Sequence, residues 1–262
     1  MSRYRAVCPF GRTDPFVVEQ VQLPAPGLSR KPSPLRFGQI SDLHLRALGP
    51  QHEQLTRTVN ELDLDFLCLT GDFLAAHVST WRPLHGLLSG FRCRHGIFAC
   101  RGNWEVKQGV RPSVFREMLA SWGVRLLVNE SCVVETPSGP VRIGGVDDVR
   151  AGWPRFDAAW RNGPPAGFNI LLSHAPLTAR FVRPKDGVDL VLSGHTHGGQ
   201  VRIPLIWRLL LPHCSGGFVD GLYPMEWGHL YVNRGFGEVG APPVRFRCPA
   251  EFAVFTVRPL TE

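Results

Sequence analysis

Two histidines separated by one residue lie in Gly194-His195-Thr196-His197, directly after the apolar run Leu190–Leu192. Neutral imidazole is the commonest metal ligand in proteins, and alternate side chains of an extended strand share one face. If the segment stays extended, both imidazoles therefore point to the same side. Gly198 and Gly199 follow and leave space for a ligand near the backbone. The stretch predicts part of a metal site, with two surface histidines in a turn as the alternative.

Other apolar runs of the chain also end in side chains that can bind metal. Four earlier runs are followed by a carboxylate, an imidazole or an amide: Asp42 and His44, then Asp72, then Asn103, then His174. Ligands bind outside the carboxyl ends of strands in open α/β sheets, so one sheet edge can bring such groups together. A single polar residue after a strand is often a cap or a solvated turn residue. Seven of them after five strands favour one shared site.

The types of donor restrict the metal. Carboxylate, amide and imidazole without thiolate suit manganese, iron or zinc better than calcium. Seven donors exceed what a single tetrahedral ion uses. Two ions roughly 3.5–4 Å apart, bridged by one carboxylate and a water, would use them all. We therefore expect two divalent metal ions as cofactors, Mn²⁺ first, with Fe or Zn²⁺ as alternatives.

In their order along the chain, these blocks resemble the five motifs of the calcineurin-like metallophosphoesterases. The blocks are Asp42-Leu43-His44, Gly71-Asp72, Gly102-Asn103, His174 and Gly194-His195-Thr196-His197, and the resemblance covers about residues 35–257. It implies an α/β fold with a two-sheet β-sandwich flanked by helices, in four layers α-β-β-α. It also implies that Asp42, His44 and His197 hold the first ion. Asn103, His174 and His195 would hold the second ion, and Asp72 would bridge the two.

Three further segments look like one branch of this family. This branch comprises the bacterial membrane-associated phosphoesterases and UDP-2,3-diacylglucosamine pyrophosphatases. The segments that resemble it are Gly198-Gly199-Gln200, residues 233–237 and residues 243–246. The resemblance implies a hydrolase in which a metal-bridging hydroxide attacks phosphorus. The substrate would be a phosphoanhydride or phosphodiester, such as a nucleotide-diphosphate lipid. A phosphodiesterase or phosphatase acting on soluble metabolites is an alternative, and a metal-binding scaffold without catalysis is another.

One position departs from the family pattern. The family usually has a histidine after the asparagine of the third block, where it protonates the leaving group, and this chain has Trp104. Indole has no basic nitrogen and cannot do this work. The substitution favours a substrate with a good leaving group, or another acid. His52, His77 and His229 are the candidates for that acid, with ordinary structural histidines as the alternative.

Trp104 is also a candidate platform for a base or an acyl chain. Together with Arg101 and Arg202 it completes the predicted substrate contacts. The segment 203–212 follows the histidines and is strongly apolar. It predicts either a buried loop over the sandwich or an amphipathic lip that meets a membrane or an acyl chain.

Composition restricts the class of protein. The chain has 262 residues, of which 44% are hydrophobic, which suits one large domain. We expect an N-terminal extension at 1–34 with an edge strand near 15–23, followed by the phosphoesterase domain at 35–262. The formal charge of +7 favours anionic substrates. The arginines are scattered, without an aromatic-interleaved basic run, so no nucleic acid is expected as a partner.

The seven cysteines form no CxxC pair, which is typical of a reducing compartment. We see no signal-peptide apolar region and no apolar run long enough for a membrane span. These observations predict a cytoplasmic protein, or one held at the surface of the inner membrane.

Strands and helices alternate in the first half of the chain, and strands dominate the second, as in layered α/β domains. Helices are expected at 51–62, 79–88, 112–121 and 155–161, with another short one after His174. The expected strands are 35–41, 65–70, 96–100, 124–128, 132–136, 141–146, 168–173, 188–193, 230–233, 244–247 and 252–257.

Overall fold

The apolar runs of the first half form one six-stranded sheet together with the two ends of the chain. The computed structural model describes residues 15–25, 27–28, 34–75, 80–161, 166–240 and 242–258. In spatial order the sheet contains β1 (Val17–Pro24), β12 (Glu251–Arg258), β2 (Leu35–Ile40), β3 (Phe66–Thr70), β4 (Ile97–Cys100) and β5 (Val124–Leu126). Strands β2 to β5 run parallel, and β12 runs against β2.

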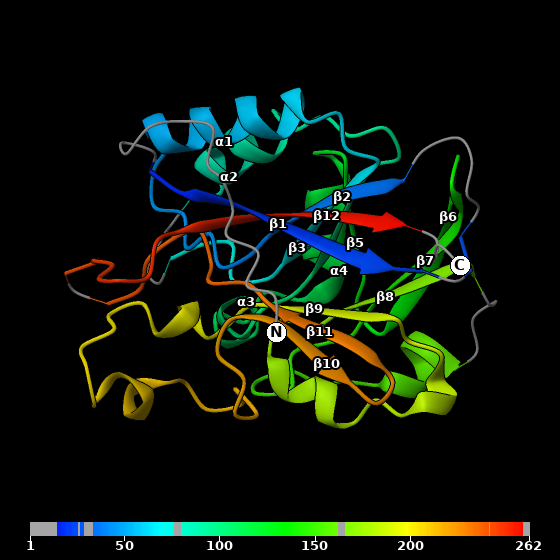
Figure 1. The fold of residues 1–262 in the computed structure, drawn as a ribbon. Coiled ribbons are helices and arrows are strands. Elements are labelled where there is room, and N and C mark those ends of the chain that lie inside the picture. The colour runs from blue at the N-terminus through cyan, green and yellow to red at the C-terminus, as the bar shows by residue number, and fades with distance from the viewer. Residues whose placement is uncertain are drawn as a thin grey trace.

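A second six-stranded sheet packs on the first (Figure 1). Its order is β10 (Gly221–Met225), β11 (Gly228–Val232), β9 (Leu190–Ser193), β8 (Phe168–Leu172), β7 (Gly139–Gly145) and β6 (Glu130–Thr136). The four central strands are parallel, and β6 and β10 are antiparallel edges.

Helices cover the outer faces, as the four-layer prediction requires. The first sheet carries α1 (Pro50–Glu61), α2 (Arg82–Leu88) and α4 (Pro112–Ala120), whose apolar faces share one core with that sheet. The second sheet is covered by short helical turns at Asp157–Arg161, Pro176–Arg180 and Pro184–Asp186 (Figure 1). The predicted two-sheet sandwich flanked by helices is confirmed.

The core between the two sheets is centred on aromatic rings. Phe37 of β2 is fully buried and stacks on Phe66 of β3 at 4.9 Å and on Phe255 of β12 at 4.8 Å between ring centroids. Strands buried on both faces are continuous apolar runs rather than alternating ones. This explains why β3, with all five residues buried, is recognisable in the sequence.

One predicted strand is absent, and two elements of the structure were not expected from the sequence. The expected strand at 244–247 is absent; only an isolated bridge joins Phe246 to Val201, and Arg247 turns the chain with φ at 55°. Strand β10 was not expected; it contains Pro224, which edge strands tolerate. Helix α3 (Asn103–Lys107) was also not expected, and it begins where the Glu105 side chain accepts the Gly102 N–H.

The edge strand predicted in the N-terminal extension is part of the first sheet. It is β1, which pairs with β12. The start of the expected helix at residue 79 lies outside the described residues.

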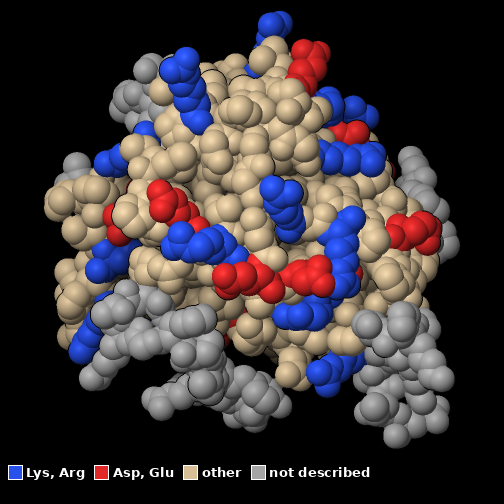
Figure 2. Space-filling view, turned by 90° about the horizontal axis from the view of Figure 1, so that it is seen from above, with Lys and Arg blue, Asp and Glu red and all other residues tan. Residues whose placement is uncertain are grey.

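The six described cysteines are free thiols. Within the described ranges, no helix has the length and apolar character needed to cross a bilayer. The face over α1 shows basic and acidic side chains interspersed (Figure 2).

Replacing Phe37 should test the packing between the sheets. Phe37→Ala removes a ring stacked on both neighbours, so it should lower the free energy of unfolding by about 3–5 kcal/mol. Val114→Ala, on the exposed side of α4, should change it by less than about 0.5 kcal/mol. Urea titration followed by tryptophan fluorescence measures both. Equal effects of the two changes would contradict the packing described here.

Candidate metal centre

The parallel strands of both sheets end at one place, and the seven side chains expected as ligands are buried there. The first sheet supplies the loops after β2, β3 and β4, and the second sheet those after β8 and β9. The residues are Asp42, His44, Asp72 and Asn103 from the first sheet, and His174, His195 and His197 from the second.

Six of these residues form two groups that could each hold a metal ion. In the first group, His197 Nε2 lies 3.1 Å from His44 Nε2 and 3.4 Å from Asp42 Oδ1. In the second group, His174 Nε2 lies 3.2 Å from His195 Nδ1 and 3.3 Å from Asp72 Oδ2. The two imidazoles of the opening motif therefore belong to different groups.

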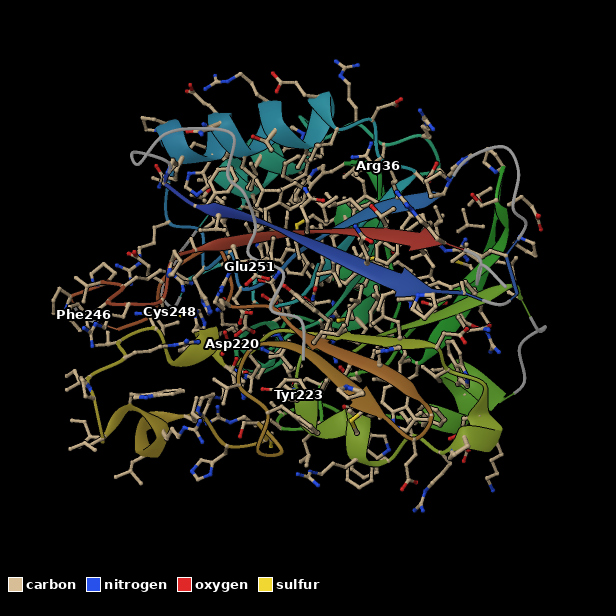
Figure 3. The ribbon with its side chains drawn as sticks, viewed as in Figure 1. Arg36, Asp220, Tyr223, Phe246, Cys248 and Glu251 are labelled. Atoms are coloured by element: carbon tan, nitrogen blue, oxygen red, sulfur yellow. The ribbon has the colours of Figure 1, made fainter. Side chains whose placement is uncertain are left out.

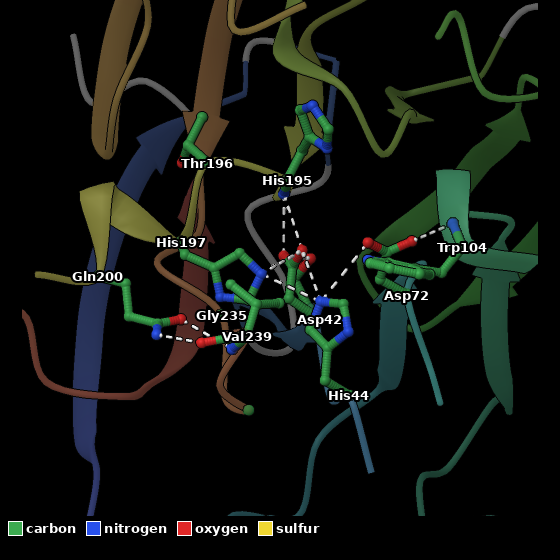
Figure 4. A network of polar contacts seen from close by, with 12 residues as sticks. Asp42, His44, Asp72, Trp104, His195, Thr196, His197, Gln200, Gly235 and Val239 are labelled. Carbon is green, nitrogen blue, oxygen red and sulfur yellow. Dashed lines mark hydrogen bonds and ion pairs between the residues drawn. The ribbon is translucent and has the colours of Figure 1, made fainter. Parts of the chain in front are cut away.

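Asp72 belongs to the second group and also faces the first. Its Oδ2 lies 3.3 Å from His174 Nε2. The same oxygen lies 3.5 Å from His44 Nε2 of the first group (Figure 4). Its Oδ1 accepts the backbone N–H of Trp104 at 2.9 Å. This is the arrangement that a bridging carboxylate needs.

Hydrogen bonds around the site leave nitrogen lone pairs directed inward. His174 Nδ1 contacts the Thr70 carbonyl at 2.7 Å, and His195 Nε2 contacts the His213 carbonyl at 2.7 Å. A carbonyl only accepts, so these two ring nitrogens carry the protons. When both rings are neutral, as metal ligands are, His174 Nε2 and His195 Nδ1 face each other as lone pairs. Such an outer contact fixes the tautomer of metal-binding histidines.

An unpartnered buried oxygen supports the same conclusion. Asn103 is 3% exposed, and its Oδ1 has no hydrogen-bond partner within the described part of the chain. Leaving a buried acceptor unpaired costs about 1–3 kcal/mol. A cation beside Asn103 would satisfy this oxygen, so the donors present fit a metal pair.

The pKa values of the histidines at the site shift in opposite directions. Burial lowers the pKa of His174, but Asp72 and Asp42 outweigh it and raise that pKa well above its ordinary value. Burial and the facing His174 lower the pKa of His195 to about 3, and burial with His44 lowers that of His197 well below its usual range. His195 and His197 are therefore neutral at pH 7, as metal ligands must be.

The backbone at the site departs from the extended form expected for the histidine motif. His195 has φ at 70° and His197 has φ at 51°, so the segment turns instead of continuing β9. Asp42, His44 and Asp72 also have positive φ, at 50°, 37° and 53°. Backbone strain of this kind clusters at functional sites and costs about 1–3 kcal/mol per residue. The turn directs the two imidazoles to separate groups.

Two glycines and one glutamate bring the loops after β3 and β4 together. A Cβ on Gly71 would lie 2.5 Å from the Gly102 nitrogen, and one on Gly102 would lie 2.1 Å from Asp72 Oδ1. Buried Glu105 accepts the N–H groups of Gly102, Asp72 and Phe73 at 2.8–3.0 Å. Glu105 was not expected from the sequence, although a glutamate at the third position of a helix often accepts the N–H group of the residue before the helix.

Trp104 lies beside the first group. Its indole meets the His44 ring edge-on at 6.2 Å, and Lys107 Nζ lies 5.3 Å from the indole centroid. The indole is half-buried at the border of the centre.

The two predicted substrate-binding arginines differ in their surroundings. Arg101 is buried and binds both oxygens of Asp147 at 2.7 Å, and its Nη1 donates to the Val110 carbonyl. This geometry argues against the expected substrate contact. Arg202 lies next to the histidine turn, donates to the Gly198 carbonyl and pairs with Asp220 at 2.7 Å.

The three candidate acids also lie in different places. His77 is outside the described residues. His229 pairs with Leu190 at the start of β9, the opposite end from His195, so it cannot serve the centre. His52 lines a cavity of about 420 Å³ together with His44, Arg46, Phe236 and others. Its Nδ1 accepts the Gly49 N–H, which leaves Nε2 as the protonated nitrogen.

Asp148 is a buried carboxylate that the sequence analysis missed. Its Oδ1 accepts the N–H groups of Arg150 and Ala151, while Oδ2 has no hydrogen-bond partner among the described residues. Burial raises its pKa, and nearby His174 opposes that shift. The signal was present, because Asp147 and Asp148 follow the apolar run that forms β7.

Comparisons with known proteins agree with this geometry. A model of the calcineurin-like phosphoesterase family matches residues 35–199, and the chain belongs to that family. Enzymes of this family are hydrolases with a binuclear divalent metal centre, and the chain has two buried groups suited to metal.

Several bacterial proteins are similar to the chain. The uncharacterized metallophosphoesterase YkuE of Bacillus subtilis is 29% identical over 84% of this chain and 78% of its own length. Phosphodiesterase YaeI of Escherichia coli is 30% identical over 71% of this chain and 68% of its own. The UDP-2,3-diacylglucosamine pyrophosphatase LpxG of Chlamydia muridarum is 30% identical over 84% and 82%.

A solved structure shares the fold. A Staphylococcus aureus protein whose crystal structure is described as that of a 5'-nucleotidase aligns with a TM-score of 0.50. The two are 12% identical, and the alignment covers 87% of this chain and 55% of that chain.

The number of Mn²⁺ ions bound per chain should show which donor group a substitution affects. The wild-type chain should retain two equivalents of Mn²⁺, and His197→Ala about one, because only the first group loses a donor. Asp72→Asn should weaken both. Plasma mass spectrometry after gel filtration measures this, with exposed Asp63→Asn as the matched control. Two retained equivalents in His197→Ala would contradict the assignment.

Proposed function

We propose that the chain is a di-metal phosphohydrolase that cleaves a phosphoanhydride or phosphodiester with a good leaving group. The observation that carries the proposal is the pair of buried donor groups that share Asp72, with Trp104 beside them. In this proposal Asp42, His44 and His197 hold one ion, and Asn103, His174 and His195 hold the other. The donor set favours Mn²⁺, with Fe or Zn²⁺ as alternatives.

Two bound divalent ions supply a reactive water at neutral pH and neutralise charge on the phosphoryl oxygens. The chain's own residues hold and orient the reactants. Asp72 and Asn103 would each hold an ion, and Asn103 would also orient the substrate. Arg46, which lines the cavity with His44, would attract the substrate's anionic group. The cavity has the size typical of small-molecule sites.

Trp104 favours a leaving group that needs no proton. An alkoxide departs slowly unless a positioned acid protonates it, which contributes roughly 10²–10⁴-fold in other enzymes. A phosphate departs readily as an anion. The indole lies where it can exclude water and contact a base or acyl chain, but it cannot give a proton to the leaving oxygen.

The finer proposal is a lipid-linked substrate such as a nucleotide-diphosphate lipid. The similarity to LpxG, a UDP-2,3-diacylglucosamine pyrophosphatase, supports it. Such a substrate is held in a membrane, so we propose a protein of the cytoplasm that contacts the inner membrane peripherally. Hydrolysis of phosphodiesters or phosphate esters of soluble metabolites is the second candidate, and the similarity to the phosphodiesterase YaeI supports it.

Turnover should separate an enzyme from a scaffold. The Mn²⁺-loaded chain should hydrolyse bis(p-nitrophenyl) phosphate and a nucleotide-diphosphate anhydride, and chelation should abolish both activities. Colorimetric and phosphate-release assays measure them. Metal-loaded protein that is inert on both substrates would favour a scaffold.

Trp104→His should test the leaving-group argument. The imidazole supplies a proton, so turnover of an alkyl phosphodiester should rise roughly tenfold or more, while that of an anhydride changes little. Trp104→Phe is the matched control, since it keeps an aromatic ring without a basic nitrogen. Equal effects of His on the two substrates would refute the argument.

A further inference from the structure

Two loops form one surface beside the metal centre; we name this surface, residues 200–212 and 242–249, the apolar rim. The loops are held together by backbone hydrogen bonds, Phe246 N–H to the Gln200 carbonyl and Arg202 N–H to the Phe246 carbonyl, both at 2.9 Å. The Gln200 side chain donates to the carbonyls of Val239 and Val244. In Figure 1 the yellow and the red-orange loops lie next to each other at the left end.

The apolar rim exposes large hydrophobic side chains. Leu205 is 97% exposed and Leu209 is 83% exposed. Six of the eleven exposed large hydrophobic side chains among the described residues belong to it: Ile203, Leu205, Ile206, Leu209, Val244 and Phe246. The alternative of a buried loop over the sandwich is therefore wrong. A concentration of exposed apolar side chains of this kind marks an interaction site.

The charge of the apolar rim has one sign. Residues 200–212 and 242–249 contain four arginines and no aspartate or glutamate. Arg208 and Arg247 are exposed and lie over the rings of Trp207 and Phe246, at 5.3 and 5.7 Å from the centroids. Figure 3 shows Phe246 at the outer end of the molecule, with Cys248 further inward. Exposed leucines beside arginines are complementary to an anionic bilayer surface, where apolar tips enter and cations meet lipid phosphates.

The apolar rim borders the centre directly. Its first loop leaves the histidine turn at Gln200 and leads to His213, whose carbonyl accepts from His195 Nε2 at 2.7 Å. Trp207 packs on Gly199, where an added Cβ would lie 2.6 Å from the Trp207 ring. Both ends of the first loop of the apolar rim contact the histidine turn. A molecule bound at the apolar rim therefore lies beside the entrance of the metal centre.

We propose that the apolar rim docks the protein on an anionic phospholipid bilayer, with Leu205 and Leu209 inserted among the acyl chains and Arg208 and Arg247 against lipid phosphates. The docking itself is carried by exposure and charge. Its use, to present a membrane-held substrate to the metal centre, rests on the proposed function.

Vesicle flotation of the full-length chain tests the docking. The wild type should float with vesicles of phosphatidylcholine and phosphatidylglycerol, and less with phosphatidylcholine alone. Leu205→Asp/Leu209→Asp should weaken flotation about tenfold or more, since two apolar tips are lost. Arg208→Glu/Arg247→Glu should remove the preference for the anionic lipid, and added salt should reduce it in the wild type.

Val114→Asp, an exposed apolar position on α4, is the matched control and should float like the wild type. All variants should hydrolyse soluble bis(p-nitrophenyl) phosphate at the wild-type rate, which shows that they fold. No flotation of the wild type, or full flotation of the double leucine variant, would overturn the docking proposal. Flotation without any hydrolysis would retain the docking and refute the proposed function instead. Concentration-dependent dimers that vanish in the leucine variant, without flotation, would assign the apolar rim to self-association and also overturn it.

Discussion

The position of the two sheets at the metal centre depends on one buried carboxylate, that of Asp42. It follows β2 of the first sheet and accepts the backbone N–H of His195, which belongs to the second sheet, at 2.9 Å. The hydroxyl of Ser41 holds the same carboxylate at 2.6 Å. Gly194 has no side chain, and a Cβ there would lie 2.2 Å from Asp42 Oδ2. This contact fixes the distance between the two halves of the donor set.

The side chains around this contact are ones whose burial is unfavourable unless a cation binds between them. Two carboxylates and four imidazoles are buried together, and five of the six have positive φ. Burial of titratable polar groups and a left-handed backbone both reduce stability. The aromatic stack around Phe37 and the helix-covered core beneath α1 supply the stability that such a site uses. The apolar core of the sandwich therefore stabilises the fold, and the loops after its strands carry the candidate metal ligands.

Much of this could be predicted because strands buried on both faces are continuous apolar runs that end at chemically active residues. The seven donors and the sandwich follow from that pattern. The sequence indicates less where geometry depends on contacts between residues distant along the chain. Arg101, which was expected to bind substrate, pairs with Asp147 in the loop after β7. Asp148 was missed although it obeys the same strand-end pattern. The left-handed turn at His195 has no local signal beyond its glycines, and the roles of the individual donors stay a proposal.

The close contact of Gly71 with Gly102 has a consequence for how this sequence can evolve. Neither residue contributes a side chain to the chemistry, yet an added methyl group at either would collide with backbone or with Asp72. Selection should therefore eliminate substitutions there as strictly as at the donors. Exposed positions away from the centre, such as Val114 on α4, carry no such steric limit. Descendants of this chain can therefore change at surface positions, while the spacing between the strand ends at the centre is conserved.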